Sequence, residues 1–327
     1  MSRSASILST GAYLPSRVLT NTDLEKMVDT SDEWIFSRTG IRERRIAAAD
    51  EFTSDMGAAA ARQALELGGI NPKDIDLIIV ATCTPDTVFP STACHIQHKI
   101  GATRAAAFDM QAACSGFLYA LVTANQFIAS GVYNTVMVIG AEKLSSIVNW
   151  EDRNTCVLFG DGAGAVILQH RPGARGLLGF DLGADGSQTE ILSVPASGCK
   201  VPLTAEVLDQ RLQYLQMSGK EVFKCAVNAM NRSAETCLET AGCKPEQIRW
   251  FIPHQANQRI VDAVRTRMNV GIERFVINLD RYGNTSAACM PIALHETSMT
   301  GKLNRGDLLL MVSFGGGLTW ASTVLEW

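Results

Sequence analysis

The chain contains a long internal repeat, and this repeat limits the folds open to it. Three pairs of segments match at one constant offset of more than half the chain: Ala64–Pro72 with Cys237–Pro245, Ile75–Val80 with Ile248–Pro253, and Val136–Ile139 with Leu309–Val312. A further match, Ala112–Cys114 with Ala287–Cys289, occurs at a slightly longer offset. So long a period is typical of two fused, similar domains, because solenoid repeats recur every ~20–50 residues.

Each copy of the repeat has the element order expected of an α/β half. An amphipathic helix, a tight turn with glycine and proline, a hydrophobic strand, a loop, a buried helix and a second hydrophobic strand follow one another. Strands that are apolar on both faces and alternate with helices predict parallel or mixed sheets covered on both sides. We therefore expect an α/β fold from two duplicated halves, residues 1–173 and 174–327, divided near Pro172 and Gly173.

Charge and composition exclude several function classes. The 327 residues are 46% hydrophobic, enough for one large globular unit or two fused ones. The net charge is −4 without a block of like charge, so we expect neither nucleic acid nor membrane as a partner. Met1–Ser6 leads only into short apolar stretches, which fits neither a secretory signal nor a membrane anchor. We expect a cytoplasmic protein.

The cysteines predict neither disulfides nor a metal site. There are nine, scattered without a CxxC pair, which favours a reducing compartment. Cys94, His95 and His98 lie close in sequence, but no second cluster or nearby acidic ligand accompanies them. We interpret them as one turn of a helix and expect no bound metal.

Cys114 lies where a nucleophile is expected, between the strand-like Ala105–Met110 and a helix-like run that starts at Phe117. Unpaired N–H groups and the positive end of the helix dipole at such a junction would lower the thiol pKa. The thiolate is the form that attacks carbonyl carbon. Alone, however, Cys114 is better explained as a small core residue, since free cysteine is often buried.

Two further polar residues follow predicted strands in the second half. His254 follows Arg249–Pro253, and Asn284 follows the strand-like Arg274–Leu279 within a Gly-Asn-Thr turn. Functional sites in α/β folds form at the carboxyl ends of strands, so these side chains are expected to meet Cys114. Singly, a helix-capping histidine and an ordinary turn asparagine are the better interpretations. Three such residues at matching strand ends favour a functional site.

Two glycine-rich stretches are interpreted differently. Ser313–Trp320 follows a predicted strand, and its backbone N–H groups, with that of Cys114, could bind the oxyanion of a thioester intermediate. A plain turn into the last strand, Ala321–Trp327, explains it equally. Phe159–Ala165 leads into a strand-like segment, whereas a phosphate loop requires a helix N-terminus. We interpret it as structural.

Eight motifs in order resemble those of the β-ketoacyl-[acyl-carrier-protein] synthases III, which are thiolase-like condensing enzymes. They are Val28–Ile35, Arg38–Arg44, Phe89–Ser91, Ala112–Gly116, Phe159–Gly164, Pro253–Asn257, Gly283–Ala287 and Phe314–Gly317. The resemblance covers almost the whole chain. It implies a thiolase-like five-layered αβαβα fold, a homodimer, and a triad of Cys114, His254 and Asn284.

The resemblance also implies roles for residues around the triad. Gly316 would supply the second oxyanion N–H beside that of Cys114. The residues implied to surround coenzyme A are Trp34, Arg38, Thr39, Arg153 and Arg259. Leu144 and Leu158 would line the acyl pocket, and Phe89 would reach into the acyl pocket of the partner subunit. The residues implied to contact acyl carrier protein are Gln255, Ala256, Asn257, Gln258, Arg259, Lys224, Arg265 and Arg267. From the residues alone, Trp34 would be core, and Lys224, Arg265 and Arg267 a solvated charged face.

The implied reaction is a decarboxylative Claisen condensation that initiates fatty-acid synthesis. Cys114 would take the acyl group of a short acyl-CoA such as acetyl-CoA, and malonyl-acyl carrier protein would supply the attacking carbon. Neutral His254 and Asn284 would donate hydrogen bonds to its thioester oxygen. No cofactor is implied, because acyl-CoA is a substrate.

Four positions are notable against the family pattern, and other interpretations stay open. Ser115 and Leu318 replace an alanine and an aromatic residue of other members, and Gln258 stands beside Arg259. Cys289 raises the question of thiolase chemistry, against which the Gly-Asn-Thr-Ser motif favours the decarboxylating synthase. A condensing enzyme or acyltransferase of secondary metabolism is the main alternative. A papain-like hydrolase fits the order Cys114, His254, Asn284, yet its cysteine signature is missing and the repeat stays unexplained. A non-catalytic binding subunit is disfavoured by the intact triad.

Overall fold

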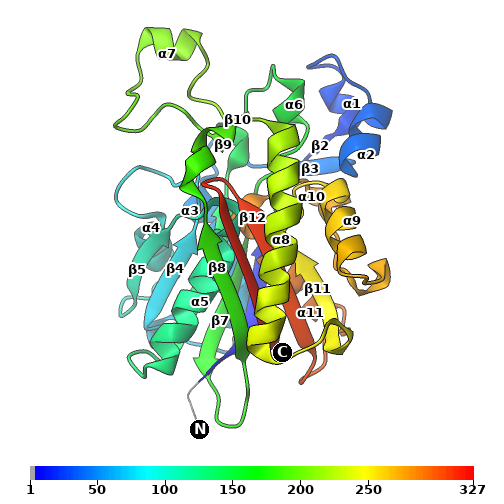
Figure 1. The fold of residues 1–327 in the computed structure, drawn as a ribbon. Helices are drawn as coiled ribbons and strands as arrows, with labels where there is room; N and C mark the ends of the chain where they lie inside the picture. The colour runs from blue at the N-terminus through cyan, green and yellow to red at the C-terminus, as the bar shows by residue number, and fades with distance from the viewer. Residues whose placement is uncertain (1–3) are drawn as a thin grey trace.

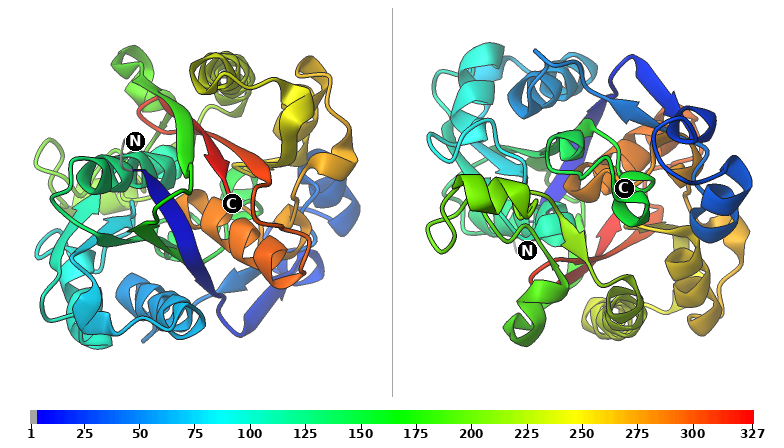
Figure 2. Two further views of the ribbon diagram at one scale, coloured as in Figure 1. Left: turned by 90° about the horizontal axis from the view of Figure 1, so that it is seen from below. Right: turned by 90° about the horizontal axis from the view of Figure 1, so that it is seen from above.

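Helices and sheets alternate in five layers in the computed structural model, which describes residues 4–327 (Figures 1 and 2). Two helices, α5 (Gly116–Ala129) and α11 (Cys289–Met299), form the central layer between two sheets. Their apolar side chains share one core with both sheets, including Leu121, Met290 and Met311. The expected thiolase-like αβαβα fold is confirmed.

The first sheet is built only from strands that precede residue 171. Its order is β1 (Ala5–Tyr13), β7 (Gly162–His170), β6 (Thr135–Glu142), β4 (Leu77–Ala81), β5 (Ala106–Met110). Strand β4 is parallel to β5 and β6, and β7 is antiparallel to β1 and β6. Outside it lie α3 (Thr53–Gly68) and α4 (Thr92–Ile100).

The second sheet is built only from strands that follow residue 176. Its order is β11 (Ile248–Pro253), β12 (Leu308–Gly315), β13 (Thr319–Glu326), β8 (Leu177–Ala184). Strands β11 and β12 are parallel, and the other pairs are antiparallel. Outside it lie α8 (Gly219–Ala241) and α9 (Gln258–Arg267). Two sheets with separate stretches of chain agree with the repeat, and the division at 173/174 stays a prediction.

Smaller elements gather at the end of the molecule where β4, β6 and β12 finish (Figure 1). They are β2 (Arg17–Thr20), β3 (Glu43–Ile46), β9 (Leu192–Ser193), β10 (Gln216–Met217), α1 (Asn21–Leu24), α2 (Asp32–Thr39), α6 (Arg153–Cys156), α7 (Ala205–Asp209) and α10 (Leu279–Tyr282). Helix α2 begins at Ser31, whose hydroxyl accepts the Trp34 N–H, and ends at left-handed Gly40. These caps place Trp34 and Arg38 on a short helix.

Helix α5 is buried as its composition predicts. Phe117, Leu118, Leu121 and Ile128 are all buried, so the helix has no solvated face along most of its length. Cys94–His98 lies within α4, which confirms the interpretation as a helix. Within residues 4–327, no cluster of three or more His, Cys, Asp or Glu suits a metal ion.

The structure corrects the alignment of one repeat pair. The 3₁₀ turns Ala113–Ser115 and Ser286–Ala288 are equivalent at the constant offset of the other three pairs, as are α5 and α11 after them. Ala113 and Ser286 both have positive φ, 46° and 49°. The longer offset that matched Cys114 with Cys289 is therefore wrong, and the repeat partner of Cys114 is Ala287. Cys289 corresponds to Gly116, because the shared turn sets the register.

A second correction concerns Arg274–Leu279, which is not a strand. A 3₁₀ turn covers Ile272–Arg274, Phe275 forms a single bridge to Phe251, and α10 begins at Leu279. Phe275 packs against the second sheet, and Leu279 packs in a separate cluster with residues such as Ile35 and Leu158. Within the described residues, the segment has no continuous strand pairing beyond the single bridge. Periodicity alone does not separate such a segment from a short strand.

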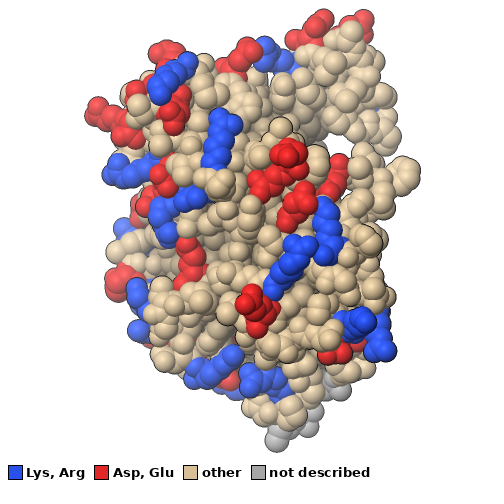
Figure 3. Space-filling model, turned by 180° about the vertical axis from the view of Figure 1, so that it is seen from behind, with Lys and Arg blue, Asp and Glu red and all other residues tan. Residues whose placement is uncertain are grey.

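No helix in residues 4–327 has the length and apolar run needed to cross a membrane. On the face shown in Figure 3, Lys and Arg side chains are interspersed with Asp and Glu. This face therefore carries no broad patch of one charge.

The close approach of the two halves predicts that Gly140 tolerates no side chain. An alanine Cβ at this position of β6 would lie 2.2 Å from the Ala287 carbonyl oxygen. We expect Gly140→Ala to lower the free energy of unfolding by about 1–3 kcal/mol, the range for overpacked sites. Denaturant titration measures the change. Gly186→Ala is the control, because no heavy atom lies within 4 Å of the methyl group that alanine would add there; equal losses for both variants would contradict the prediction.

Candidate active site

A cavity of about 870 Å³ opens at the end of the molecule where the parallel strands finish. Cys114 comes from the turn before α5, His254 from the residue after β11, and Asn284 from the segment between α10 and α11. All three line this cavity, together with Gly316 from the β12–β13 connection. The structure therefore brings these residues together in one cavity, and their catalytic roles stay a prediction.

Cys114 lies in the tight turn Ala113–Ser115 and is 9% exposed. Burial raises the pKa of its thiol to about 12, and the Ser286 hydroxyl, which lowers it, only partly opposes this effect. The expectation that the helix N-terminus lowers the pKa below its ordinary value is therefore wrong for the unliganded site. Desolvation of the thiolate is the larger effect in this buried turn.

His254 is held by its backbone and not by its ring. Its N–H donates to the Val312 carbonyl oxygen at 2.7 Å, which continues the pairing of β11 with β12. Both ring nitrogens are buried without a hydrogen-bond partner in the described chain. Burial lowers the pKa of the imidazole to about 4, so the ring is neutral near pH 7. A neutral ring presents one N–H donor to the cavity.

Asn284 is fixed so that its amide nitrogen remains the donor. The Ser286 N–H donates to Asn284 Oδ1 at 2.9 Å, which holds the carbonyl side of the amide. Its backbone is tied to the first half, because its N–H donates to Leu158 O at 2.8 Å and its carbonyl accepts from Gly160 N–H at 3.1 Å. The side chain thus offers N–H groups, with no charge, to a cavity it lines.

The glycine-rich connection lies against the Cys114 turn. A Cβ on Gly315 would come within 2.6 Å of the Cys114 nitrogen, so only glycine permits this approach. Gly316 follows and lines the cavity. Backbone N–H groups of two tight segments therefore lie near the thiol, and an oxyanion hole of Cys114 and Gly316 stays a prediction.

The cavity has an aromatic and cationic region. The guanidinium carbons of Arg38 and Arg153 lie 4.7 Å and 5.0 Å from the centroid of the Trp34 ring. Trp34, Arg38, Thr39 and Arg259 line the cavity, whereas Arg153 is not among the lining residues. Stacked guanidinium groups beside an indole suit a ligand with an aromatic base and phosphates.

Part of the cavity lining is apolar. Leu144 and Leu158 line the cavity together with Ile147, Val157 and Leu215, and an acyl pocket at Leu144 and Leu158 stays a prediction. Phe89 does not line this cavity; it is 83% exposed in the loop between β4 and α4. Its placement agrees with the expectation that it serves a neighbouring subunit, which stays a prediction.

The expected carrier-protein residues divide into two groups. Gln255 is fully buried, and its amide bonds to the backbone of Val276, Asn278 and Leu279. It cannot contact a protein surface, so that expectation is wrong: the side chain anchors the segment before α10. Ala256 and Asn257 line the cavity. The remaining side chains are at least partly exposed: Lys224 on α8, and Gln258, Arg259, Arg265 and Arg267 on α9.

Ser115, Leu318 and Cys289, which are notable against the family pattern, are all buried. Ser115 is buried and its hydroxyl donates to Thr319 O at 3.2 Å, while Leu318 is buried beside the second sheet. Cys289 accepts the Gln255 N–H at 3.3 Å, and burial raises the pKa of its thiol to about 12. Cys289 is not among the residues that line the cavity.

Sequence reasoning missed Glu142, Ser286 and Cys83. Glu142 is a buried carboxyl group at the end of β6, and Ser286 and Cys83 line the cavity near it. The available signal for Glu142 was a charged residue at the end of an apolar strand. Asp161, in the glycine-rich Phe159–Ala165, accepts hydrogen bonds from Ala47 N–H and from Ser145, which supports the structural interpretation of that stretch.

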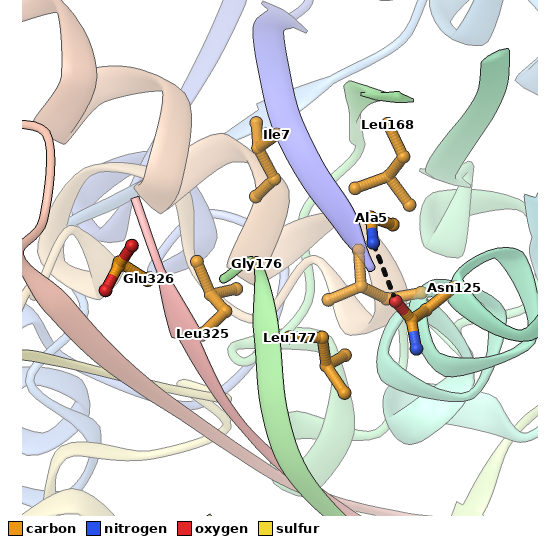
Figure 4. A pocket seen from close by; sticks show the side chains of 9 residues that line it. Ala5, Ile7, Asn125, Leu168, Gly176, Leu177, Leu325 and Glu326 are labelled. Atoms are coloured by element: carbon orange, nitrogen blue, oxygen red, sulfur yellow. Dashed lines mark hydrogen bonds between the residues drawn. The ribbon is translucent and has the colours of Figure 1, made fainter. Parts of the chain in front are cut away.

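A second cavity, shown in Figure 4, lies near the start of β1 and β8. It holds about 10 Å³ and is lined largely by apolar side chains such as Ile7, Leu121 and Leu177. Its one hydrogen bond drawn, from the Ala5 N–H to Asn125 Oδ1 at 3.0 Å, satisfies the strand end. A space of this size admits at most one water molecule.

Comparisons with known proteins agree with the geometry. The family model described as 3-Oxoacyl-[acyl-carrier-protein (ACP)] synthase III matches residues 108–186, and its C-terminal counterpart matches residues 238–327. A Beta-ketoacyl-[acyl-carrier-protein] synthase III from Caldanaerobacter subterraneus subsp. tengcongensis is 53% identical over 99% of this chain and 98% of its own length.

Solved structures give the same result. The 3-oxoacyl-[acyl-carrier-protein] synthase III of Aquifex aeolicus is 50% identical, with a TM-score of 0.92 over 99% of this chain and 100% of its own. The priming β-ketosynthase of a polyketide biosynthetic pathway is 35% identical, with a TM-score of 0.93 over 99% of this chain and 96% of its own.

The neutral state of His254 predicts a specific pH dependence of stability. Its folded pKa of about 4 lies below the ordinary value of 6.5. Below pH 6.5 the His254 ring binds a proton in the unfolded chain but not in the folded chain. The free energy of unfolding therefore falls by about 1.4 kcal/mol per pH unit down to pH 4. Between pH 6.5 and 5, we expect the native chain to lose ~2 kcal/mol more than His254→Gln in denaturant titrations. An imidazole NMR midpoint near 6.5 for His254 would contradict this.

Proposed function

This chain belongs to the 3-oxoacyl-[acyl-carrier-protein] synthase III family, and we propose that Cys114, His254 and Asn284 perform its reaction. The chain is an acyltransferase of fatty-acid biosynthesis with β-ketoacyl-[acyl-carrier-protein] synthase III function. One observation carries the assignment of the residues: a buried thiol and two uncharged donors line the same cavity.

The first half-reaction transfers an acyl group to Cys114. The sulfur attacks the thioester carbonyl of a short acyl-CoA, and the carbonyl oxygen becomes an oxyanion. The N–H groups of Cys114 and Gly316 stabilise this charge, which pre-oriented donors do most effectively in a cavity without bulk water. The C–S bond to coenzyme A then breaks, coenzyme A leaves as a thiol, and the acyl group remains as a thioester of Cys114.

The second half-reaction forms the carbon–carbon bond. Malonyl carried on acyl carrier protein places its thioester oxygen against the N–H donors of His254 and Asn284. Its carboxylate leaves as carbon dioxide, and the electron pair of the broken bond forms an enolate. Neutral donors suit this step because they stabilise the enolate without protonating it. The carbanion attacks the acyl-Cys114 carbonyl, and release of the Cys114 sulfur gives the β-ketoacyl product.

The substrate entrance is assigned to the aromatic and cationic region. Trp34, flanked by Arg38 and Arg153, suits the adenine ring, and Arg259 and Thr39 lie nearby for phosphate and ribose groups. The acyl chain then extends along Leu144 and Leu158. Lys224, Arg259, Arg265 and Arg267 on α8 and α9 supply positive charge for an acidic carrier protein, with Gln258, Asn257 and Ala256 beside them.

The reaction is assigned to side chains alone, without a cofactor or metal, since a thiol, an imidazole and an amide account for each step. We place the two substrates in the cytoplasm with the enzyme. The nucleophile lies in the first half, residues 1–173, and the two hydrogen-bond donors lie in the second half, residues 174–327.

A second candidate function is the priming condensation of a polyketide pathway. The 35% identical priming β-ketosynthase has the same fold over nearly the whole chain. The relatives named for fatty-acid synthesis are more similar, at 50% and above. A papain-like hydrolase is set aside, because the αβαβα fold explains the repeat and that interpretation does not.

Substitution of the triad is expected to separate the two half-reactions. Cys114→Ala abolishes transfer of radiolabel from acetyl-CoA to the protein. His254→Ala and Asn284→Ala still take up label but lose condensation with malonyl-acyl carrier protein by roughly 10²–10³ each, the usual cost of one such donor. Cys289→Ala, which removes a buried thiol outside the cavity, serves as the control and keeps labelling. Loss of labelling in all three triad variants would instead favour general-base action of His254.

The dimer is tested through Phe89. The family resemblance implies that Phe89 packs into the acyl pocket of a second copy, and its 83% exposure within one subunit is compatible with that role. We expect a dimer in sedimentation, and a roughly tenfold loss of kcat/KM for acyl-CoA in Phe89→Ala from lost burial of one aromatic side chain. Leu67→Ala, an exposed apolar change on α3, is the control and leaves kcat/KM unchanged. A monomer with full activity would refute the role of Phe89.

A further inference from the structure

Glu142 is a buried carboxyl group with an unusual set of neighbours. It is the last residue of β6 and has no solvent exposure. A buried carboxylate is costly unless it is hydrogen-bonded or paired with a cation. No Lys or Arg in residues 4–327 forms an ion pair with it. Its neighbour Lys143 is directed away and donates to the carbonyl oxygens of Ala48 and Glu51.

Hydrogen bonds from neutral groups hold this carboxyl group in place. The Thr84 hydroxyl donates to Oε2 at 2.6 Å, and the Ser286 hydroxyl donates to Oε1 at 3.0 Å. The Cys83 N–H lies 3.1–3.2 Å from the two oxygens, the Cys83 thiol 3.3 Å from both, and the Thr82 hydroxyl 3.3 Å from Oε2. Donors from both halves of the chain therefore converge on one acceptor.

Ser286 connects this carboxyl group to the active site. Its N–H donates to Asn284 Oδ1 at 2.9 Å, and its hydroxyl donates to Glu142. The turn that begins at Ser286 contacts the turn that carries Cys114, both residues line the cavity, and the Ser286 hydroxyl lowers the pKa of the Cys114 thiol. Its backbone has a positive φ of 49°, which non-glycine residues adopt rarely. The hydroxyl has one proton, so it can donate either to Glu142 or to a Cys114 thiolate, but not to both at once.

The first half-reaction requires a place for the Cys114 proton. The thiol is buried and its pKa is raised to about 12, whereas the pKa of His254 is lowered to about 4. Transfer to His254 would place two new charges in a buried cavity, which is unfavourable. The pKa of Glu142 is instead raised by burial, so its carboxylate is a better proton acceptor than an exposed one.

We propose that Glu142 accepts the Cys114 proton through the Ser286 hydroxyl when the nucleophile is activated. This inference rests on the proposed role of Cys114 as the nucleophile. In this relay the Ser286 hydroxyl lies between the reacting sulfur and Glu142, and Glu142 is a positioning residue that acts through Ser286. His254 keeps its role as a neutral donor in the later condensation.

The relay conserves protons and charge. The S–H bond of Cys114 breaks as a new Oγ–H bond forms on Ser286, and the original Oγ–H bond breaks as an Oε–H bond forms on Glu142. The buried site carries one negative charge before and after, first on the carboxylate and then on the thiolate. The Ser286 hydroxyl afterwards donates to the thiolate. When the C–S bond to coenzyme A breaks, the proton on Glu142 passes back through the Ser286 hydroxyl to the departing sulfur, so coenzyme A leaves as a thiol and Glu142 is again a carboxylate.

The alternative is that Glu142 only holds the loop and contributes its charge. The titratable groups that face it are the thiols of Cys83 and Cys114. As a plain negative charge, Glu142 raises the pKa of Cys114, so its neutralisation would speed thiolate formation at every pH. The relay predicts slower acyl transfer to Cys114 in Glu142→Gln near neutral pH, because the proton acceptor is lost, and this effect has the opposite sign.

The test is the single-turnover rate of radiolabel transfer from acetyl-CoA to Cys114 between pH 5.5 and 9.5. Full-length protein is used, and peptide mass spectrometry follows Cys114 separately from the other cysteines. For the native chain we expect the rate to rise to a plateau once Glu142 is a carboxylate, because the proton acceptor is then fully available. In Glu142→Gln the rate near neutral pH is lower and rises about tenfold per pH unit without a plateau, because only the small thiolate fraction of an isolated thiol reacts.

Two further variants complete the experiment. Ser286→Ala retains the charge but breaks the path, so it should also lose the plateau; it decides the question if Glu142→Gln fails to fold. Asp161→Asn changes another buried, hydrogen-bonded carboxyl group and should keep the native profile. Thermal unfolding reports the fold of each variant.

The outcomes separate this inference from the function. A native profile without a plateau, or a plateau retained in Ser286→Ala, would overturn the relay. So would faster acyl transfer in Glu142→Gln at all pH values. Absence of any label on Cys114, or normal acyl transfer in Cys114→Ala, would instead refute Cys114 as the nucleophile.

Discussion

The contact between the two tight turns at the centre of the molecule is the constraint on which the site depends. The turn Ala113–Ser115 lies against β12, and the turn Ser286–Ala288 lies against β6. Gly315 and Gly140 permit these approaches, because a methyl group on either would collide with the opposite backbone. Close backbone contact between the two halves brings residues from both into one cavity.

The two halves share a backbone arrangement, and the positions at which their residues differ include the reactive groups of the site. At the constant offset of the repeat, Cys114 corresponds to Ala287 and Glu142 corresponds to Gly315. The small glycine leaves room for the nucleophile's backbone N–H, while the glutamate at the matching place fills a polar pocket beside Ser286. The turn Ala113–Ser115 therefore carries a thiol that lines the cavity. The Ser286 hydroxyl of the other turn and the Glu142 carboxyl group at the end of β6 lie beside it.

Burial explains the electrostatics of the site. Desolvation raises the pKa of Cys114 and lowers that of His254, so the resting site holds uncharged groups at both positions. Such a site stabilises negative charge that develops during reaction, because its donors are already oriented and no water must reorganise. The same burial makes a free thiolate costly, so an activating partner close to the sulfur has a clear physical role.

The amino-acid pattern was enough to predict the fold class, the repeat and the three residues that line the cavity together. Periodicity and glycine-proline turns predicted strands β4, β6, β11 and β12 and the buried helix α5, because local apolar patterns reflect burial. The pattern could not give the pKa of Cys114, the register of the Ala287 turn, the irregular path of Arg274–Leu279 or the burial of Gln255. These features, and the grouping of Glu142, Ser286 and Cys83, follow from the packing of distant segments. The reason is that desolvation and hydrogen-bond partners come from residues 59 and 144 positions apart in the chain, whose proximity no local pattern encodes.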